Sequence, residues 1–163
     1  MVIEYRIDTC SLGTVVVATT SGAICCLEFL DEATQAPFLL RRRFPKATLI
    51  EESNDLQSVA LRQLDNPDDS AMDIPLNLIG TPYQVTVWNA LRSIPIGATA
   101  SYREVADKIG HPRAWRAVGN AIATNPVAII IPCHRVLPSS GALGNYRWGA
   151  WRKSALLHRE KYR

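Results

Sequence analysis

Three consecutive isoleucines that end at a proline constrain this chain more than any other stretch. Residues 129–131 are branched and apolar, and Pro132 follows them directly. Such a run is typical of a buried strand, and proline cannot continue the hydrogen-bond ladder of a sheet. The sequence therefore predicts a buried strand that stops at Pro132, with Cys133 and His134 at its end, where reactive side chains are often placed.

Cys133 also has a second interpretation, because a free cysteine is most often a small buried hydrophobic residue. No two of the four cysteines are spaced as C-x-x-C, and the three histidines form no ligand pattern. We expect free thiols, no metal site and no cofactor. Whether Cys133 is reactive or structural stays open on these residues alone.

The composition is that of an ordinary globular protein of one or two small domains. The 163 residues are 47% hydrophobic and 20% charged, which suffices for a real core. No segment is apolar for long enough to span a bilayer, and the N-terminus lacks the basic and apolar regions of a signal peptide. We therefore expect a cytoplasmic protein, or a nuclear one if the organism is eukaryotic, with no membrane partner.

Charge is distributed unevenly along the chain. Residues 1–80 hold six Lys and Arg against twelve Asp and Glu, a net charge of −6. Residues 81–163 hold twelve Lys and Arg against three Asp and Glu, a net charge of +9. This asymmetry indicates a polyanionic partner for the basic part, although a solvated basic face gives the same pattern.

Residues 1–73 are predicted to form an α/β supporting domain with a small antiparallel sheet. Gly13 and Gly22 mark turns between runs that are rich in apolar and β-branched residues. The acidic stretch 65–73 is expected to be a linker. Strands are expected over residues 2–7, 14–20 and 23–29, and helices over residues 37–44 and 54–64.

Residues 74–163 are predicted to form a mostly helical domain. Thr81 and Pro82 are expected as the N-cap and the first residue of one helix. A capping box over residues 101–104 starts another. Because a further helix is expected to begin near Arg113, after a turn that contains glycine, these last two helices form a helix-turn-helix candidate.

The helix that begins near Arg113 has two different faces. Its small and apolar positions follow helical spacing and are expected to face inward: Ala114, Ala117, Val118 and Ala121. The opposite face carries its polar residues and two flanking ones: Arg113, Arg116 and Asn120, with Trp115 and Gly119. Such a face is typical of a helix that approaches nucleic acid closely, although an ordinary surface helix shows the same pattern.

The last helix is predicted over residues 150–161. Glu160 follows Leu156 and Leu157 by four and three residues, and it therefore lies on the face that these leucines bury. A carboxylate aimed inward usually has a partner. The alternative is a frayed terminus with Glu160 in water.

Several stretches of the second half occur in an order that one known family shares. They are Gly-Thr-Pro-Tyr-Gln at 80–84 with Val-Trp at 87–88, Ile-Pro-Ile-Gly at 94–97, Ser-Tyr at 101–102, Arg-Ala-Val-Gly at 116–119, Asn-Pro at 125–126, Ile-Pro-Cys-His-Arg-Val at 131–136, Gly-Asn-Tyr-Arg-Trp-Gly at 144–149, and Glu160. About half of the chain thus resembles the O(6)-alkylguanine-DNA alkyltransferases, which are suicide repair proteins. Its Tyr-Arg-Trp-Gly stretch is similar to the C-terminal half of the bacterial adaptive-response proteins.

The resemblance implies a single-turnover reaction in which Cys133 is both the nucleophile and the final acceptor of the alkyl group. The substrate would be O6-alkylguanine, and also O4-alkylthymine. His134 would take the proton through one water, because adjacent side chains of an extended chain point apart, and Glu160 would orient His134. Asn125 would brace the active-site turn by hydrogen bonds to the backbone. The implied fold of residues 1–73 is ribonuclease H-like.

The resemblance also implies that a monomer binds double-stranded DNA containing alkylated guanine. The damaged nucleotide would be flipped out of the duplex while the helix-turn-helix lies in the minor groove. Arg116 would fill the vacated stack, and Tyr102 would crowd the phosphate and hydrogen-bond the flipped base. The other implied DNA contacts are Arg113, Gly119, Asn120 and Arg135, and the implied base pocket is lined by Val136, Ser139, Tyr146 and Arg147.

Two residues depart from the family pattern. Trp115 is bulky beside Arg116, and Arg147 follows the pocket tyrosine, where a small residue would leave more room. We therefore expect methyl groups to be repaired better than benzyl-sized groups.

Two other functions compete with repair. A sequence-specific helix-turn-helix regulator would explain the charge asymmetry, but it leaves residues 132–135 and Glu160 without a role. A cysteine hydrolase would explain the Cys133 and His134 pair, but it requires an oxyanion site that the sequence does not identify.

Overall fold

The chain folds into two compact units in the computed structural model, which describes residues 1–161. One unit comprises Met1–Ile79 and Pro126–Ile130, and the other comprises Gly80–Asn125 and the residues from Ile131 onward. A short segment just before the reactive cysteine candidate therefore belongs to the first unit. The expected domains of residues 1–73 and 74–163 stay a prediction about which parts fold as units.

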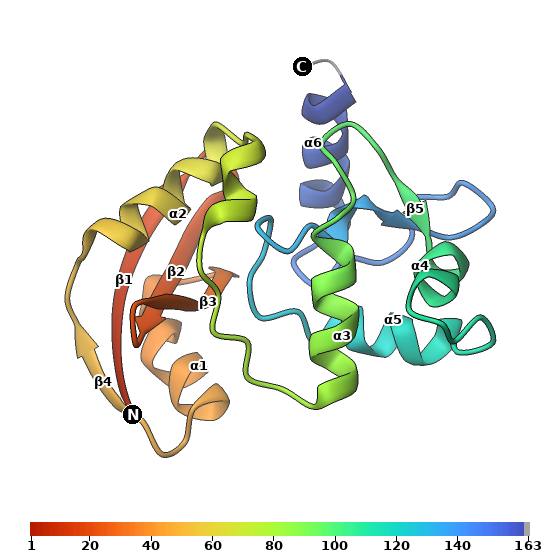
Figure 1. Ribbon diagram of the computed structural model, residues 1–163. Coiled ribbons are helices and arrows are strands. Elements are labelled where there is room, and N and C mark those ends of the chain that lie inside the picture. Colours follow the sequence, from red (N-terminus) through yellow and green to blue (C-terminus); the bar gives the residue numbers. More distant parts are fainter. Residues whose placement is uncertain (162–163) are drawn as a thin grey trace. The chain divides into compact units, whose positions relative to one another are not determined.

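A mixed four-stranded sheet forms the centre of the first unit (Figure 1). Its strands are β1 (Val2–Cys10), β2 (Gly13–Thr20), β3 (Ala23–Leu30) and β4 (Thr48–Glu51), in the order β3-β2-β1-β4. The first three are antiparallel, as predicted, but β4 pairs in parallel with β1, so the expectation of a purely antiparallel sheet was wrong. A four-residue, mostly exposed edge strand carries too weak an apolar pattern to be found from sequence.

Helices cover both faces of this sheet. The first is α1 (Ala36–Arg43), preceded by the 3₁₀ turn η1 (Ala33–Gln35), and its Leu40 packs in a core with Ile3 and Tyr5 of β1. Side chains alternate along a strand, so Glu4 lies on the other face, where it accepts a hydrogen bond from Asn54, the N-cap of α2 (Asp55–Asp65). The acidic stretch expected as a linker contains a further 3₁₀ turn, η2 (Asp69–Asp73).

The isoleucine run is buried, but it is not a strand. Pro126 and Ala128 exchange backbone hydrogen bonds with Leu27 of β3, and the chain then turns at Ile129. Ile129 has a φ of 70°, and the N–H of Ile130 donates to the Ala128 carbonyl across it. An isoleucine in the left-handed region is strained and is held only by its surroundings. The predicted strand was wrong because apolar periodicity shows burial and does not distinguish a strand from a buried turn.

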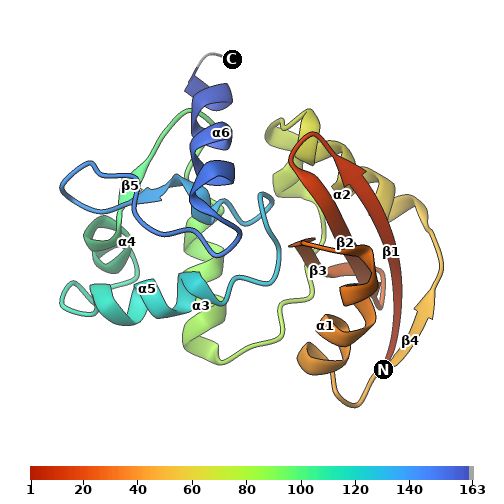
Figure 2. The same ribbon diagram turned by 180° about the vertical axis from the view of Figure 1, so that it is seen from behind.

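Among the described residues, the second unit consists of helices and a two-stranded parallel sheet (Figure 2). Thr81 caps α3 and Ser101 caps α4, both in capping boxes at the predicted positions. The indole N–H of Trp88 donates to the Ala121 carbonyl at 2.9 Å, which joins α3 to α5. The elements are α3 (Pro82–Leu91), β5 (Ala100–Ser101), α4 (Tyr102–Lys108), α5 (Trp115–Ala123), the 3₁₀ turn η3 (Cys133–Arg135), β6 (Val136–Leu137) and α6 (Ala150–Lys161).

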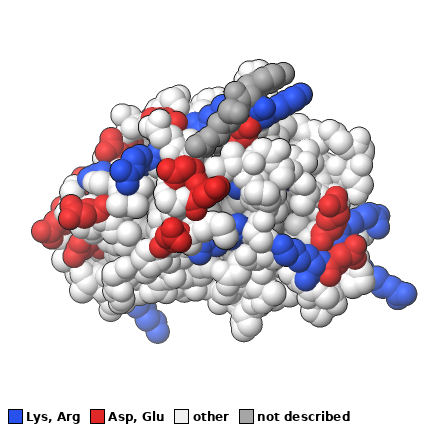
Figure 3. All heavy atoms as spheres, turned by 45° about the horizontal axis from the view of Figure 1, so that its top comes forward, with Lys and Arg blue, Asp and Glu red and all other residues white. Residues whose placement is uncertain are grey.

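The face drawn in Figure 3 carries acidic and basic side chains interspersed, and neither sign covers this face continuously. Arg135 and Lys153 are buried, so two basic residues of the second half are not part of the charged surface. No helix within residues 1–161 is long and apolar enough to cross a membrane.

Candidate active site

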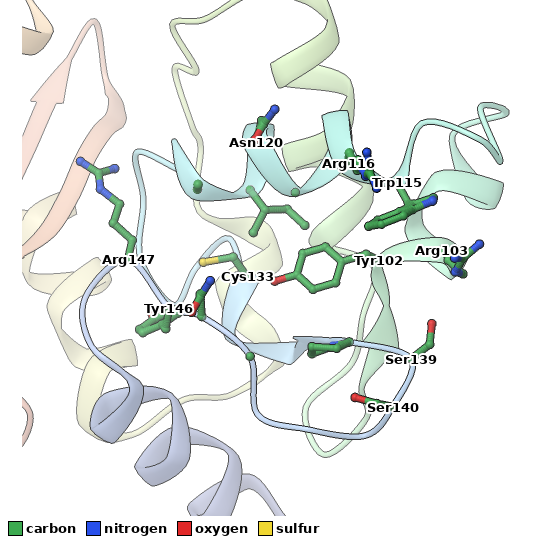
Figure 4. A pocket seen from close by; sticks show the side chains of 16 residues that line it. Tyr102, Arg103, Trp115, Arg116, Asn120, Cys133, Ser139, Ser140, Tyr146 and Arg147 are labelled. Carbon is green, nitrogen blue, oxygen red and sulfur yellow. The ribbon is translucent and has the colours of Figure 1, made fainter.

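A cavity of about 820 Å³ in the second unit has Cys133 among the residues that line it (Figure 4). Its wall includes Tyr102 at the start of α4, Gly119 of α5 and the loop over residues 138–147. Cys133 itself is only 4% exposed. The sulfur is thus covered by protein but borders a space large enough to admit a purine base.

A tight turn and one asparagine hold the sulfur in place. The Cys133 N–H donates to the Ile131 carbonyl at 2.8 Å across Pro132. The Asn125 Nδ2 group donates both to that carbonyl at 2.9 Å and to the Cys133 sulfur at 3.1 Å. Sequence analysis predicted that Asn125 would brace the backbone, but nothing in the sequence indicated its bond to the sulfur.

Burial raises the pKa of the Cys133 thiol to about 11. The Asn125 hydrogen bond and the positive charges of Lys153 and Arg147 act against this rise, because each favours the thiolate. The thiol therefore carries its proton at neutral pH, and a base must remove this proton when the sulfur attacks.

His134 and Glu160 form a buried pair beside the cysteine. The His134 Nε2 and Glu160 Oε1 atoms are 2.8 Å apart, and both side chains are shielded from solvent. A carboxylate accepts, so Nε2 carries the proton and Nδ1 of the neutral ring is a proton acceptor. Nδ1 is buried and has no hydrogen-bond partner among residues 1–161. Burial lowers the pKa of His134, against the raising effect of Glu160, so the ring is neutral near pH 7.

Glu160 has a second partner that sequence analysis assigned elsewhere. Arg135 donates to both of its carboxylate oxygens, at 3.0 and 2.9 Å, and also to the Ile94 carbonyl at 2.7 Å. Burial alone would raise the pKa of Glu160, but the bonds from His134 and Arg135 lower it to about 2. The prediction that Arg135 contacts DNA was wrong, since its guanidinium is buried in this pair.

Lys153 is a site residue that sequence analysis missed. It is fully buried in α6, and its Nζ donates to the Val136 carbonyl at 2.8 Å and the Asn145 carbonyl at 3.1 Å. Burial lowers its pKa, and its charge lowers that of Cys133. A signal was present, because Lys153 precedes Glu160 by two helical turns and shares its inward face.

The outer face of α5 is arranged largely as predicted. Arg113, Arg116 and Asn120 are exposed, and the last two line the cavity together with Gly119. Ala117 was expected in the core but is exposed, because the helix buries only the narrow stripe formed by Val118, Ala121 and Ile122.

Three of the four residues predicted to line a base pocket lie in the wall of the cavity that contains Cys133. Ser139, Tyr146 and Arg147 line the cavity, whereas Val136 does not, since β6 pairs with β5 and buries its side chain. The Tyr146 hydroxyl is buried with no hydrogen-bond partner among residues 1–161, and burial raises its pKa well above the ordinary value. Arg147 donates to the Asn125 carbonyl at 2.9 Å, which fixes its guanidinium.

Metal-ligating side chains do not gather in the part of the chain that the structure describes: no three His, Cys, Asp or Glu residues are placed to hold an ion. Cys25, Cys26 and Cys133 are free, buried thiols.

This chain is similar in sequence to members of a known protein family. Residues 82–162 match the model described as 6-O-methylguanine DNA methyltransferase, DNA binding domain. The bifunctional transcriptional activator/DNA repair enzyme Ada of Escherichia coli is 40% identical, over 98% of this chain and 46% of Ada. The chain thus spans about half the length of that relative. A methylated-DNA–protein-cysteine methyltransferase of Mycolicibacterium paratuberculosis is 37% identical, over 98% of this chain and 93% of the relative.

Solved structures give the same result. The crystal structure of Mycobacterium tuberculosis OGT in complex with DNA is 37% identical in sequence, with a TM-score of 0.77 over 98% of this chain and 93% of that one. The O6-methylguanine methyltransferase of the same organism has a TM-score of 0.78 over 99% of this chain and 94% of that one. The α/β fold with a small mixed sheet and helices is shared with these proteins.

Proposed function

Because the chain belongs to the methylated-DNA–protein-cysteine methyltransferase family, we propose that it transfers an alkyl group, mainly methyl, from O6-alkylguanine in DNA to Cys133. The observation that carries this proposal is the placement of Cys133 in the wall of a base-sized cavity, next to a buried His134 and Glu160 pair. O4-alkylthymine presents the same alkyl–oxygen bond and is proposed as a second substrate.

The transfer is a displacement at carbon. The Cys133 sulfur attacks the alkyl carbon, the new S–C bond forms, and the C–O6 bond breaks with its electron pair going to guanine. The thiol proton passes through one water to His134, whose unpaired Nδ1 is the acceptor that the geometry provides. The leaving guanine takes a proton at its ring from the Tyr102 hydroxyl, and water returns a proton to that hydroxyl as His134 releases the one it took from Cys133. Because the thioether is stable, each molecule acts once.

Each residue around the sulfur has a defined part in this step. Asn125 donates to the sulfur and stabilises negative charge as it develops. The cations of Lys153 and Arg147 act in the same direction. Glu160 keeps the proton of His134 on Nε2, so that Nδ1 stays free to accept.

DNA binding is proposed for the helix-turn-helix formed by α4 and α5. Arg113, Asn120 and the small Gly119 let α5 lie in the minor groove, and Arg116 enters the stack when the damaged nucleotide is flipped out. The similar Mycobacterium tuberculosis OGT was crystallised in complex with DNA, which supports DNA as the partner of this chain. Flipping costs a few kcal/mol of unstacking, and the contacts of α5 offset it.

Stoichiometry separates this function from its competitors. Wild-type protein is incubated with an excess of duplex DNA that contains one O6-methylguanine. Repair is expected to stop when one lesion has been removed for each protein molecule. Continued turnover would identify a hydrolytic enzyme, and binding without any repair would identify a regulator; either result would overturn the proposal.

A further inference from the structure

Two arginines flank the indole of Trp115 at the wall of the cavity. The guanidinium carbons of Arg103, on α4, and Arg116, on α5, each lie over the indole ring at 5.0 Å from its centroid. All three residues line the same cavity as Cys133, and Figure 4 shows the indole between the two arginines. The cluster formed by Arg103, Trp115 and Arg116 therefore lies where a nucleotide on its way to Cys133 would pass.

The contact with the Trp115 indole orders the Arg116 side chain, which would otherwise be mobile. Arg116 is exposed, and no carboxylate pairs with it within residues 1–161. An exposed arginine samples many rotamers and loses this freedom when it inserts into a ligand. A guanidinium held over an indole ring has lost part of that freedom beforehand.

We infer that Trp115 is a positioning residue for Arg116 and that it acts on base extrusion, not on the chemistry at Cys133. The inference rests on the proposed function, because it concerns the step in which Arg116 replaces the extruded base. The indole holds the Arg116 guanidinium over the cavity, so that insertion requires less ordering of the side chain.

Two other roles for Trp115 fit the geometry less well. A platform for a stacked base needs a free ring face, but both arginines already lie over the ring. A core residue would be buried, whereas Trp115 is only partly buried, at the first position of α5. The bulky ring of Trp115 is thus explained by its ordering of the Arg116 guanidinium.

The test compares transfer from saturating duplex DNA with transfer from free O6-methylguanine, both in single turnover. Trp115→Ala is expected to slow the duplex reaction about three- to fivefold, the size of the cost of ordering one long side chain, and to leave the free-base reaction unchanged. Trp115→Phe keeps a ring and is expected to restore part of the rate. Trp151→Ala removes a tryptophan–arginine contact of the same kind on α6, outside the cavity, and is expected to change the saturated rate by less than about twofold.

A double variant decides whether Trp115 acts through Arg116. In an Arg116→Ala background, Trp115→Ala is expected to have no further effect on the duplex rate. A further loss of the same size would overturn the inference and place Trp115 in direct contact with DNA. Equal slowing on duplex and free base would overturn it in favour of a structural role.

A readout without transfer keeps the inference testable if the proposed function fails. The ¹⁵N relaxation order parameter of the Arg116 Nε–H group is expected to fall in Trp115→Ala. An unchanged value would overturn the ordering role of Trp115 even where Cys133 takes up the alkyl group normally. Absence of any alkyl group on Cys133 in the wild type would instead overturn the proposed function.

Discussion

Two buried cysteines, one in each unit, differ in hydrogen bonding: the Cys26 thiol donates a hydrogen bond, whereas the Cys133 sulfur accepts one. In the sheet of the first unit, the Cys26 thiol donates to Glu28 at 3.5 Å, and Arg43 pairs with the same carboxylate. In the second unit, Asn125 donates to the Cys133 sulfur. Burial raises the pKa of both thiols, but the charge of Glu28 raises that of Cys26 further, whereas the Asn125 bond lowers that of Cys133. The two thiols therefore differ in the direction of the hydrogen bond and in access to a cavity, and under the proposed function these two differences make Cys133 the reactive one.

The cysteines themselves give the largest expected difference. Cys133→Ala is expected to abolish alkyl transfer while DNA binding persists, because the nucleophile and acceptor are lost and the face of α5 is not. Cys26→Ala is expected to transfer normally and to lose about 1 kcal/mol of unfolding free energy. Single-turnover transfer, binding titration and denaturant unfolding measure the three quantities. Transfer by Cys133→Ala would show that Cys133 is not the acceptor of the alkyl group.

Asn125→Ala tests the hydrogen bond that distinguishes the two sites. The variant removes the donor to the sulfur and to the Ile131 carbonyl, and the pKa of Cys133 is expected to rise. Transfer is expected to slow about ten- to hundredfold, the size of a hydrogen bond to a charged group. Rates from free O6-methylguanine measure this effect apart from DNA binding. An unchanged rate would show that the bond only shapes the turn.

Arg116→Ala separates access to Cys133 from its chemistry. Transfer from duplex DNA is expected to slow about tenfold, because unstacking is no longer offset, and far less from the free base. Matched single-turnover rates on the two substrates measure the ratio. If Arg116 instead contacts a phosphate, binding weakens and the salt dependence falls by about one ion, while the saturated rate stays normal.

Glu160→Gln is expected to have the smallest effect on rate and a clear effect on stability. Its amide oxygen still accepts from His134, so transfer near pH 7 slows only severalfold. Arg135 loses its charged partner, which costs about 2–3 kcal/mol of unfolding free energy by denaturant titration. An unchanged stability would show that Glu160 adds nothing to the buried pair.

The pH dependence of the same variant has a definite sign. The wild-type pKa of Glu160 is lowered to about 2, so its contribution to stability is present above pH 4.5 and is lost as the pH falls towards 2. Glu160→Gln has no carboxyl group at this position, so its stability does not fall in this way between pH 4.5 and 2. Glu160 also raises the pKa of His134, so its removal is expected to move the acid limb of the transfer rate to lower pH. A shift to higher pH would contradict the assignment of His134 as the base.

Local features of the fold followed from the sequence, whereas partnerships between distant residues did not. The start of α3 was predictable from an N-cap threonine before a proline, and that of α4 from a capping box, because both signals involve residues close together in the sequence. The short strand β4 was missed because its pattern is weak. Periodicity indicated that residues 129–131 are buried, but their backbone bonds to β3 are non-local.

The site shows the same division. The family resemblance implied catalytic roles for Cys133, His134 and Glu160. The structure places His134 and Glu160 within hydrogen-bond distance of each other. Arg135 was assigned to DNA because an arginine beside a reactive cysteine carries no signal for the carboxylate 25 residues away that buries it. Lys153 was missed although its spacing from Glu160 places it on the same inward face of the last helix, because its acceptors are backbone carbonyls that any residue type provides.

The position of the alkyl group after one reaction shows whether Cys133 is the acceptor. Protein is mixed with one equivalent of duplex DNA containing O6-methylguanine, digested, and mapped by mass spectrometry, with Cys25 and Cys26 as internal controls. We expect one methyl group per molecule, on the peptide that contains Cys133, and unmodified thiols at the two control positions. A methyl group on Cys25 or Cys26, or repaired DNA without a methylated Cys133, would contradict this expectation.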